Sequence, residues 1–313
     1  MSGQSQARTV PLSPTRAAFL SLMNLRRRRA ETDERADLID RYSAAVGVDT
    51  VLSSAIAQFH TFAIPEISSI LHRTRQYRDD GLRRLDDTKG LMGAALGGGP
   101  ESVDGAAAIA QINRIHAEYR IANDEYLYVL STFAFGSDHW MQNYAWRSAT
   151  TDEETVLYQR LVDVGRAMGI DDIPDDSAEF RCWVDGYLAS NRRYHQDNHA
   201  VAEGLMRAAE SLVPAPIRPL VSPVLRVWIA EPDLLDALGY RLPPQPFVFG
   251  LNAAMAARRA FNRRFTAMNG QTFTDGFLAS SLATRPDGFA SFSELGPPAL
   301  LQKFARQDLA LQR

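Results

Sequence analysis

His116 stands in a stretch, residues 110–133 (AQINRIHAEYRIANDEYLYVLSTF), that otherwise has the pattern of an amphipathic helix. Ile109, Ile112 and Ile115 define its apolar face, and His116 follows the first of them by seven residues and the second by four. This spacing places side chains on one side of a helix, so the imidazole is predicted to point inward. A buried imidazole needs a hydrogen-bond partner or a metal, since leaving it unpaired costs about 1–3 kcal/mol.

Two interpretations of His116 follow from this helix alone. In the first it is a core histidine, bonded to a neighbouring side chain or carbonyl. In the second it binds a metal, but a mononuclear site made only of protein ligands would need two or three further His, Asp or Glu side chains, and the helix supplies none. Haem is different, because one axial histidine is enough to hold it. Both interpretations stay open at this point.

A second unusual stretch, residues 81–96 (GLRRLDDTKGLMGAAL), places Arg84 and Thr88 on or beside an apolar stripe, with Arg84 seven residues before Leu91. An inward guanidinium requires an anion, because an unpaired buried charge is costly. The anion could be an Asp or Glu of another helix, a haem propionate, or the negative charge that dioxygen gains at an iron. Thr88 is predicted either to donate a hydrogen bond beside Arg84 or to bond its own backbone.

The sequence also gives predictions for four other polar residues. Asp86 and Asp87 are predicted to face solvent or to pair with Arg83. His195 and His199 have the i, i+4 spacing that allows two histidines to share a metal, but no third ligand is evident beyond the nearby Asp197, and a solvated helix face is the alternative.

Pro65 is predicted to kink or interrupt its helix, and such kinks often serve pockets. His60 or Glu66 could therefore approach a pocket, with Glu66 as a base. His139 follows Gly136 in an expected loop that could contact the pocket edge. The many aromatic residues between 126 and 146 are interpreted as core, with some of them available to line an apolar channel.

Composition excludes several classes of function. The chain has 313 residues, 45% hydrophobic and 23% charged, which is typical of globular proteins. A net charge of −3 gives no support for a nucleic-acid partner. One cysteine, Cys182, excludes an intrachain disulfide and a thiolate metal site, and favours a reducing compartment.

Targeting signals are also missing from the pattern. Arginines fill positions 26–29, but the charged residues AETDERADLIDRY follow them, whereas an export signal needs an apolar stretch there. No apolar run approaches the roughly 20 residues of a membrane span. We therefore expect a cytoplasmic protein without a transmembrane segment, whose oligomeric state the sequence does not define.

Helical periodicity dominates the chain, and no strand alternation, phosphate loop or internal repeat is evident. Residues 1–13 are predicted to be disordered, residues 14–267 to form one large helical domain, and residues 268–313 to be irregular. The fold class predicted is therefore all-α. The expected helices cover residues 14–29, 33–46, 49–73, 78–96, 101–119, 123–135, 152–168, 177–213, 217–229, 231–239 and 247–267.

Five motifs occur in one order and together carry a resemblance to a known family. They are FAIPEIS (62–68), RLDDT (84–88), INRIHAEYRIANDEYLYVLSTF (112–133), HW (139–140) and WR (146–147). The chain resembles the haem-dependent oxygenases typified by the mycophenolic-acid oxygenase mpaB and the rubber oxygenase (latex-clearing protein), over roughly residues 35–240. The Arg-x-x-x-Thr element followed 28 residues later by His116 is its most specific part, and the 112–133 motif places the chain nearer the mpaB branch.

The resemblance implies a b-type haem in an all-α, partly globin-like core. His116 matches the proximal ligand of the haem iron, and Arg84 and Thr88 match the conserved Arg and Thr of the family. Asp87 stands where the rubber-oxygenase branch has a lysine, so we expect no distal lysine ligand. The mpaB enzyme carries a membrane anchor that this chain lacks, which weighs against a membrane-bound polymer or lipid substrate.

The function predicted is a haem b-dependent oxygenase that uses O2 to oxygenate or cleave the C=C bond of a small apolar substrate, such as an isoprenoid. In this hypothesis His116 holds the iron while Arg84 and Thr88 orient the bound oxygen. Two alternatives stay open: a non-catalytic haem or gas-binding protein on the same core, and a haem-free helical interaction protein in which His116 belongs to the core.

Overall fold

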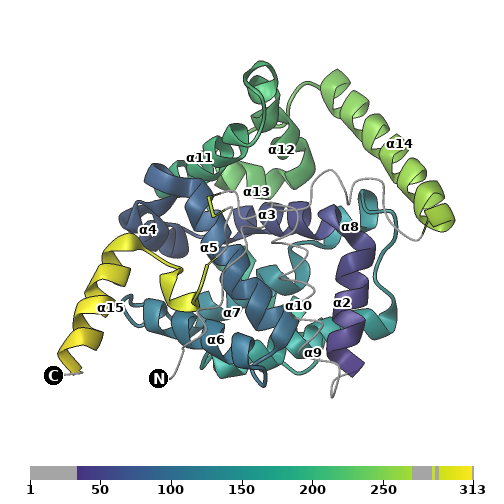
Figure 1. The fold of residues 1–313 in the computed structure, drawn as a ribbon. Helices are drawn as coiled ribbons and strands as arrows, with labels where there is room; N and C mark the ends of the chain where they lie inside the picture. Colours follow the sequence, from purple (N-terminus) through teal and green to yellow (C-terminus); the bar gives the residue numbers. More distant parts are fainter. Residues whose placement is uncertain (1–33, 270–283, 286–288, 312–313) are drawn as a thin grey trace, which may run out of the picture.

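A computed structural model of the chain describes residues 34–269, 284–285 and 289–311. The disorder expected for residues 1–13 and the helix expected for 14–29 lie outside these residues. In the described ranges the chain forms helices and connecting loops without a strand, and they build one helical domain (Figure 1). The predicted all-α class is confirmed.

From α2 to α14 the helices follow one another with short connections. In chain order they are α2 (Glu34–Val46), α3 (Val48–Phe62), α4 (Pro65–Thr74), α5 (Gln76–Gly98), α6 (Val103–His116), α7 (Asn123–Phe135), α8 (Asp138–Asn143), α9 (Thr151–Ala167), α10 (Ser177–Asn191), α11 (Gln196–Ser211), η1 (Ala215–Leu220), α12 (Val221–Ile229), α13 (Pro232–Ala237), α14 (Gln245–Asn269), η2 (Phe292–Glu294) and α15 (Pro298–Leu311).

Helix α5 is central to the packing, because it contacts α6, α11, α4, α2 and α9. Two separate apolar clusters are buried between α5 and the helices around it. The larger one joins α3, α5, α8 and α11–α14 and contains the fully buried Phe59, Trp140 and Leu234. A second one fills the α5–α6 interface and contains Leu91, Ile112 and the later Leu295. Both clusters therefore fix the orientation of α5.

Two predicted helices are interrupted. Residues 49–73 divide into α3 and α4, and Pro65 begins α4 at a first-turn position that needs no backbone N–H, as expected. Residues 177–213 divide into α10 and α11, because Arg192 has an extended backbone. Buried Asn198 stabilises this break by donating to the carbonyls of Arg193, at 2.9 Å, and Ala237, at 3.0 Å. An amide bonding to backbone outside its own helix leaves no signal in helical periodicity.

The C-terminal part differs from its prediction. Residues 268–313 were expected to be irregular, but Pro298–Leu311 form the helix α15, which begins at a proline. Phe304 of α15 is buried, and Arg114 of α6 lies over its ring at 4.2 Å. Tertiary packing on α6 therefore holds a helix whose sequence alone gave too weak a pattern.

Two glycines allow α5 and α11 to approach closely. A Cβ atom on Gly204 would lie 2.4 Å from the carbonyl oxygen of Tyr77, and one on Gly81 would lie 3.0 Å from the carbonyl oxygen of Gly204. Backbone oxygens cannot move aside as flexible side chains do, so neither position tolerates a larger residue. This contact sets how α5 lies on the rest of the molecule.

Replacing Gly204 tests this contact. We expect Gly204→Ala to lower the free energy of unfolding by about 2–3 kcal/mol, because the added methyl group forces α5 and α11 apart. Gly186→Ala in α10 is the matched control, since nothing lies within 4 Å of its Cβ position; it should raise stability by about 0.5–1 kcal/mol through helix propensity. Urea unfolding measures both, and equal effects would contradict the close approach.

Candidate functional site

His116 is the last residue of α6, where the helix ends in a turn closed by the N–H of Tyr119 donating to the His116 carbonyl at 2.9 Å. Its ring lies against Tyr126 of α7, with ring centroids 5.4 Å apart. The sequence predicted the inward direction of His116, and it placed Tyr126 among aromatic residues that form the core or line an apolar channel. The α6–α7 turn is what brings the two rings together.

The imidazole of His116 is buried without being satisfied. Its Nδ1 atom is inaccessible to solvent and has no hydrogen-bond partner. Burial and, as the smaller cause, the nearby positive charge of Arg84 together lower the pKa of His116 to about 4. The ring is therefore neutral at pH 7, which is the form that binds metals. The hydrogen bond to a neighbouring side chain or carbonyl that a core histidine would make is not found at Nδ1 among the described residues.

Arg84 and Thr88 lie one turn apart on α5 and bind each other. Arg84 Nη1 donates to Thr88 Oγ1, while that hydroxyl donates to the Arg84 carbonyl at 2.8 Å. A hydroxyl has one proton to give and two lone pairs, so it can do both. The predicted bond of Thr88 to its own backbone is present, and it orients the hydroxyl toward the guanidinium. The guanidinium also lies 5.6 Å from the ring centroid of Tyr77.

The charge of Arg84 lacks a carboxylate partner. Across residues 34–269, 284–285 and 289–311, no Asp or Glu lies within ion-pair distance of it. Its positive charge instead acts on its neighbours, lowering the pKa of His116 and opposing the burial that raises the pKa of Tyr77 and Tyr119. Of the three anions considered from sequence, the carboxylate of another helix is therefore not found. The predicted site residues therefore place one cation, held by Thr88, near one neutral imidazole.

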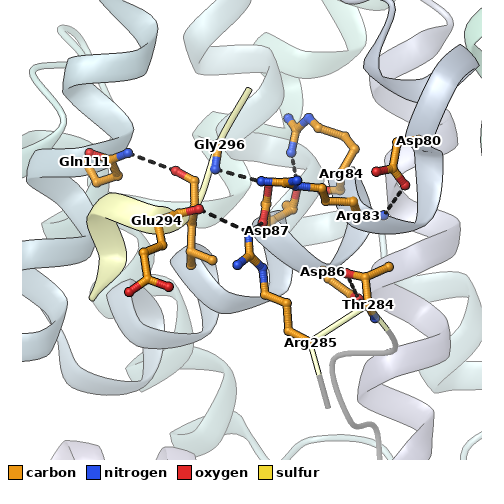
Figure 2. Close-up of polar contacts among 12 residues, drawn as sticks. Asp80, Arg83, Arg84, Asp86, Asp87, Gln111, Thr284, Arg285, Glu294 and Gly296 are labelled. Carbon is orange, nitrogen blue, oxygen red and sulfur yellow. Dashed lines mark hydrogen bonds and ion pairs between the residues drawn. The ribbon is translucent and has the colours of Figure 1, made fainter. Parts of the chain in front are cut away.

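Asp86 and Asp87 do not face solvent as predicted. Asp86 is 0% exposed and Asp87 is 2% exposed. Asp87 has the expected partner Arg83, with Nε 3.9 Å from Oδ2, but it also binds the chain's C-terminal part. The sequence missed this because the partners are nearly 200 residues away (Figure 2).

His195 and His199 do not share a site. His195 precedes α11 and caps it, its Nδ1 accepting from the N–H of Asp197 at 3.2 Å. His199 lies on the helix and its Nδ1 contacts the carbonyl of Leu238 at 2.9 Å. The two rings therefore have separate partners, and the His195 side chain is 43% exposed to solvent. In the described part of the chain, no group of three or more His, Cys, Asp or Glu side chains is arranged to hold a metal ion.

The other candidates lie in different surroundings. His60 is buried 3.7 Å from Glu231, and burial lowers its pKa. Glu66 forms an ion pair with Arg193 at the surface. His139 lies in α8, not in the expected loop. The contacts found for these residues therefore do not join them to Arg84 or His116.

Two cavities accompany these residues. One of about 340 Å³ is lined by residues that include His60, Tyr128, Arg192 and Glu231. Another of about 380 Å³ is lined by residues that include His139 and Tyr144. Neither of these two cavities is lined by His116, Arg84 or Thr88.

The chain matches a family model described as the catalytic domain of the ER-bound oxygenase mpaB/B' and rubber oxygenase, over residues 41–260. No solved structure matches it. Among curated proteins it is similar to the ER-bound oxygenase mpaB of Penicillium brevicompactum, 29% identical over 147 residues that cover 44% of this chain and 38% of that protein.

A second relative is the ER-bound oxygenase mpaB of Penicillium roqueforti, 28% identical over 160 residues that cover 48% of this chain and 54% of that protein. The alignments thus span between a third and just over half of these relatives. Although both relatives are described as ER-bound, no helix among the residues described for this chain is both long enough and apolar enough to cross a membrane.

The lowered pKa of His116 predicts how stability depends on pH. The unfolded chain takes up a proton near pH 6.5 and the folded chain near pH 4, so the unfolding free energy decreases as pH falls from 7 to 5, by up to about 1.4 kcal/mol per pH unit. His116→Gln should remove this component in urea unfolding of the haem-free protein.

His72→Gln is the control, because the His72 side chain is 41% exposed. It should leave the pH dependence close to that of the unsubstituted protein. Identical pH dependence in His116→Gln and the unsubstituted protein would contradict a buried, neutral His116.

Proposed function

Because the chain belongs to the mpaB and rubber oxygenase catalytic-domain family, we propose that it is a haem b-dependent oxygenase whose iron is held by His116 and whose substrate is small and apolar. The family is one of oxygenases, so the reaction class is oxidoreduction with O2. The haem, the residue roles and the substrate class are our inference.

The observation that carries the proposal is the buried Nδ1 of His116, which has no hydrogen-bond partner. It belongs to a neutral imidazole, and a single such ring suffices to hold a haem. The second support is Arg84, a guanidinium without a carboxylate among the described residues. A haem propionate would supply that anion, so the donor set fits the cofactor on two counts.

Bound haem supplies the one-electron chemistry that lets dioxygen react with an organic substrate. The chain's own contribution is positioning and charge. Arg84 presents a fixed cation near His116, and such a charge stabilises negative charge that develops during oxidation. Thr88 accepts a hydrogen bond from Nη1 of Arg84 and so holds the guanidinium in place. Because Arg84 is already oriented, its reorientation does not add to the activation barrier of the reaction.

The substrate class rests on chemistry around these residues. Tyr126 beside His116 offers an apolar ring face, which suits an alkene better than a charged metabolite. The family description names a rubber oxygenase, whose substrate is a hydrocarbon polymer. We therefore propose oxygenation or cleavage of a C=C bond in a small apolar molecule.

Haem binding also requires space. Neither of the two cavities described above is lined by His116, and the ring of Tyr126 lies against the imidazole, so we propose that Tyr126 moves when a macrocycle enters. The position of His116 at the end of α6, beside a turn, favours such movement, because helix ends open at lower cost than helix centres.

Haem binding is tested by absorption spectroscopy. The purified protein, supplied with haem, is expected to show a Soret band that shifts when CO is added after reduction. His116→Ala should lose the band while its circular dichroism stays helical. His60→Ala is the control, because it removes another buried histidine and should retain the band. A protein that stays colourless would favour the haem-free alternative.

The role of Arg84 is tested by turnover. Arg84→Leu should weaken haem binding, because a propionate loses its cation, and in the haem-loaded variant it should lower O2 consumption with an apolar alkene by about 100-fold, because it removes a charged donor from the reacting region. Arg78→Leu is the matched control on the same helix, where the arginine pairs with Asp79 in solvent. Binding of O2 without consumption by the unsubstituted protein would instead favour the non-catalytic alternative.

A further inference from the structure

The turn of α5 between Arg84 and Thr88 contains two buried carboxylates. Asp86 and Asp87 have side chains 0% and 3% exposed. Charges removed from water in this way are tolerated only where partners satisfy them, and removing one partner of a buried pair typically costs about 3–5 kcal/mol. The partners of these two residues therefore determine the position of the turn.

Asp86 is satisfied mainly by one residue from far along the chain. Its Oδ2 accepts from both the backbone N–H and the hydroxyl of Thr284, each at 2.7 Å. Lys89 lies 3.8 Å from the other carboxylate oxygen. Two hydrogen bonds from one residue fix both the position and the direction of Asp86 (Figure 2).

Asp87 is held from two points of the same distant segment. Arg285 Nη2 donates to Oδ1 at 3.1 Å, and the N–H of Gly296 donates to Oδ2 at 3.1 Å. Arg285 Nη2 also donates to the carbonyl of Glu294 at 3.0 Å, which ties the two points together. Burial raises the pKa of Asp87, and Arg285, Gly296 and Arg83 all oppose that rise.

The segment that holds α5 also packs on α6, the helix that carries His116. Gln111 donates to the carbonyl of Leu295 at 2.8 Å, and the Leu295 side chain is fully buried between the two helices. Gly296 has φ +137°, and a Cβ atom there would lie 2.7 Å from Ile115. The segment therefore contacts α6 at the residue next to His116.

We propose that residues 284–285 and 289–311, the C-terminal clamp, position Arg84 and Thr88 relative to His116, with Arg285 and Asp87 as the positioning pair. This inference rests on the proposed function for its consequence. The clamp lies beyond residues 41–260, which match the family model, so nothing in that match assigns it a role.

Few steps connect Arg285 to the position of Arg84. Asp87 lies between Arg84 and Thr88 in the chain, and its carboxylate is attached to the clamp rather than to α5 itself. When Arg285 is lost, a buried carboxylate loses its only strong cation, since Arg83 is 3.9 Å away. The turn must then shift to hydrate Asp87, and this moves the guanidinium of Arg84.

The first experiment needs no haem. Amide hydrogen exchange is measured on the haem-free full chain for Arg285→Gln, Arg285→Lys and the control Lys303→Gln. Lys303 belongs to the same clamp but pairs with Glu118 at the surface. Exchange of the amides of residues 85–91 should rise roughly tenfold in Arg285→Gln, return toward the original rate in Arg285→Lys, and stay unchanged in the control.

The second experiment reads out the position of Arg84. In the reduced, haem-loaded protein with CO, the C–O stretching frequency reports positive charge beside the ligand. Arg285→Gln should shift it in the same direction as Arg84→Leu does, and Arg285→Lys should restore it. A purely structural role of Arg285 would leave this frequency unchanged.

Asp87→Asn is the second variant, used if Arg285→Gln does not fold. It removes the buried negative charge at residue 87, so the folded protein no longer requires a cation beside it. Asp87→Asn should shift the frequency in the same direction, because the ion pair that links α5 to the clamp is lost, and adding Arg285→Gln to Asp87→Asn should change the frequency no further. Unchanged exchange of residues 85–91 in the folded variants would overturn the clamp, whatever the haem experiments show. Failure of haem to bind would overturn the proposed function and leave the exchange result standing.

Discussion

A neutral imidazole beside a guanidinium that has no carboxylate partner among the described residues is the constraint on which the proposed chemistry depends. His116 stays neutral because it is buried, and the charge of Arg84 acts in the same direction. Neither group is satisfied by the described residues around it, since Nδ1 of His116 has no partner and Arg84 binds a neutral hydroxyl. Such an arrangement lowers stability unless a ligand completes it, and a metalloporphyrin with its propionates carries both missing partners.

The fold serves this pair by fixing α5. Gly81 and Gly204 let α5 press against α11 on one side. Residues of the C-terminal part bind Asp86 and Asp87 and fill the α5–α6 interface. Arg84 thus projects from a helix held along its length, whereas His116 ends a helix and adjoins a turn. We infer that the cation is the rigid part of the site and that the imidazole side adapts.

Several features of the site and of the fold were predictable from the sequence. The spacing of His116 from Ile109 and Ile112 predicted its inward direction, and the spacing of Arg84 from Leu91 placed that cation near the same interior. These predictions succeeded because they depend on helical geometry within one element. The interruption at Pro65 was predictable for the same reason, since the missing N–H acts locally.

The errors concern residues whose environment comes from distant segments. Asp86 and Asp87 have the composition of a solvated turn, and only Thr284, Arg285 and Gly296 explain their burial. The break before α11 depends on Asn198 bonding to another helix's carbonyl. Helix α15 is held by contacts with α6. Contacts between distant segments leave no signal in the hydrophobic periodicity of a short stretch of sequence.

The most direct test of the central claim is resonance Raman spectroscopy of the reduced, haem-loaded protein. The account predicts an iron–histidine stretching band that shifts when the histidines are labelled with ¹⁵N, disappears in His116→Gly, and returns when imidazole is added to that variant. A band that persists unchanged in His116→Gly without imidazole would show that another residue holds the iron, and would contradict the account.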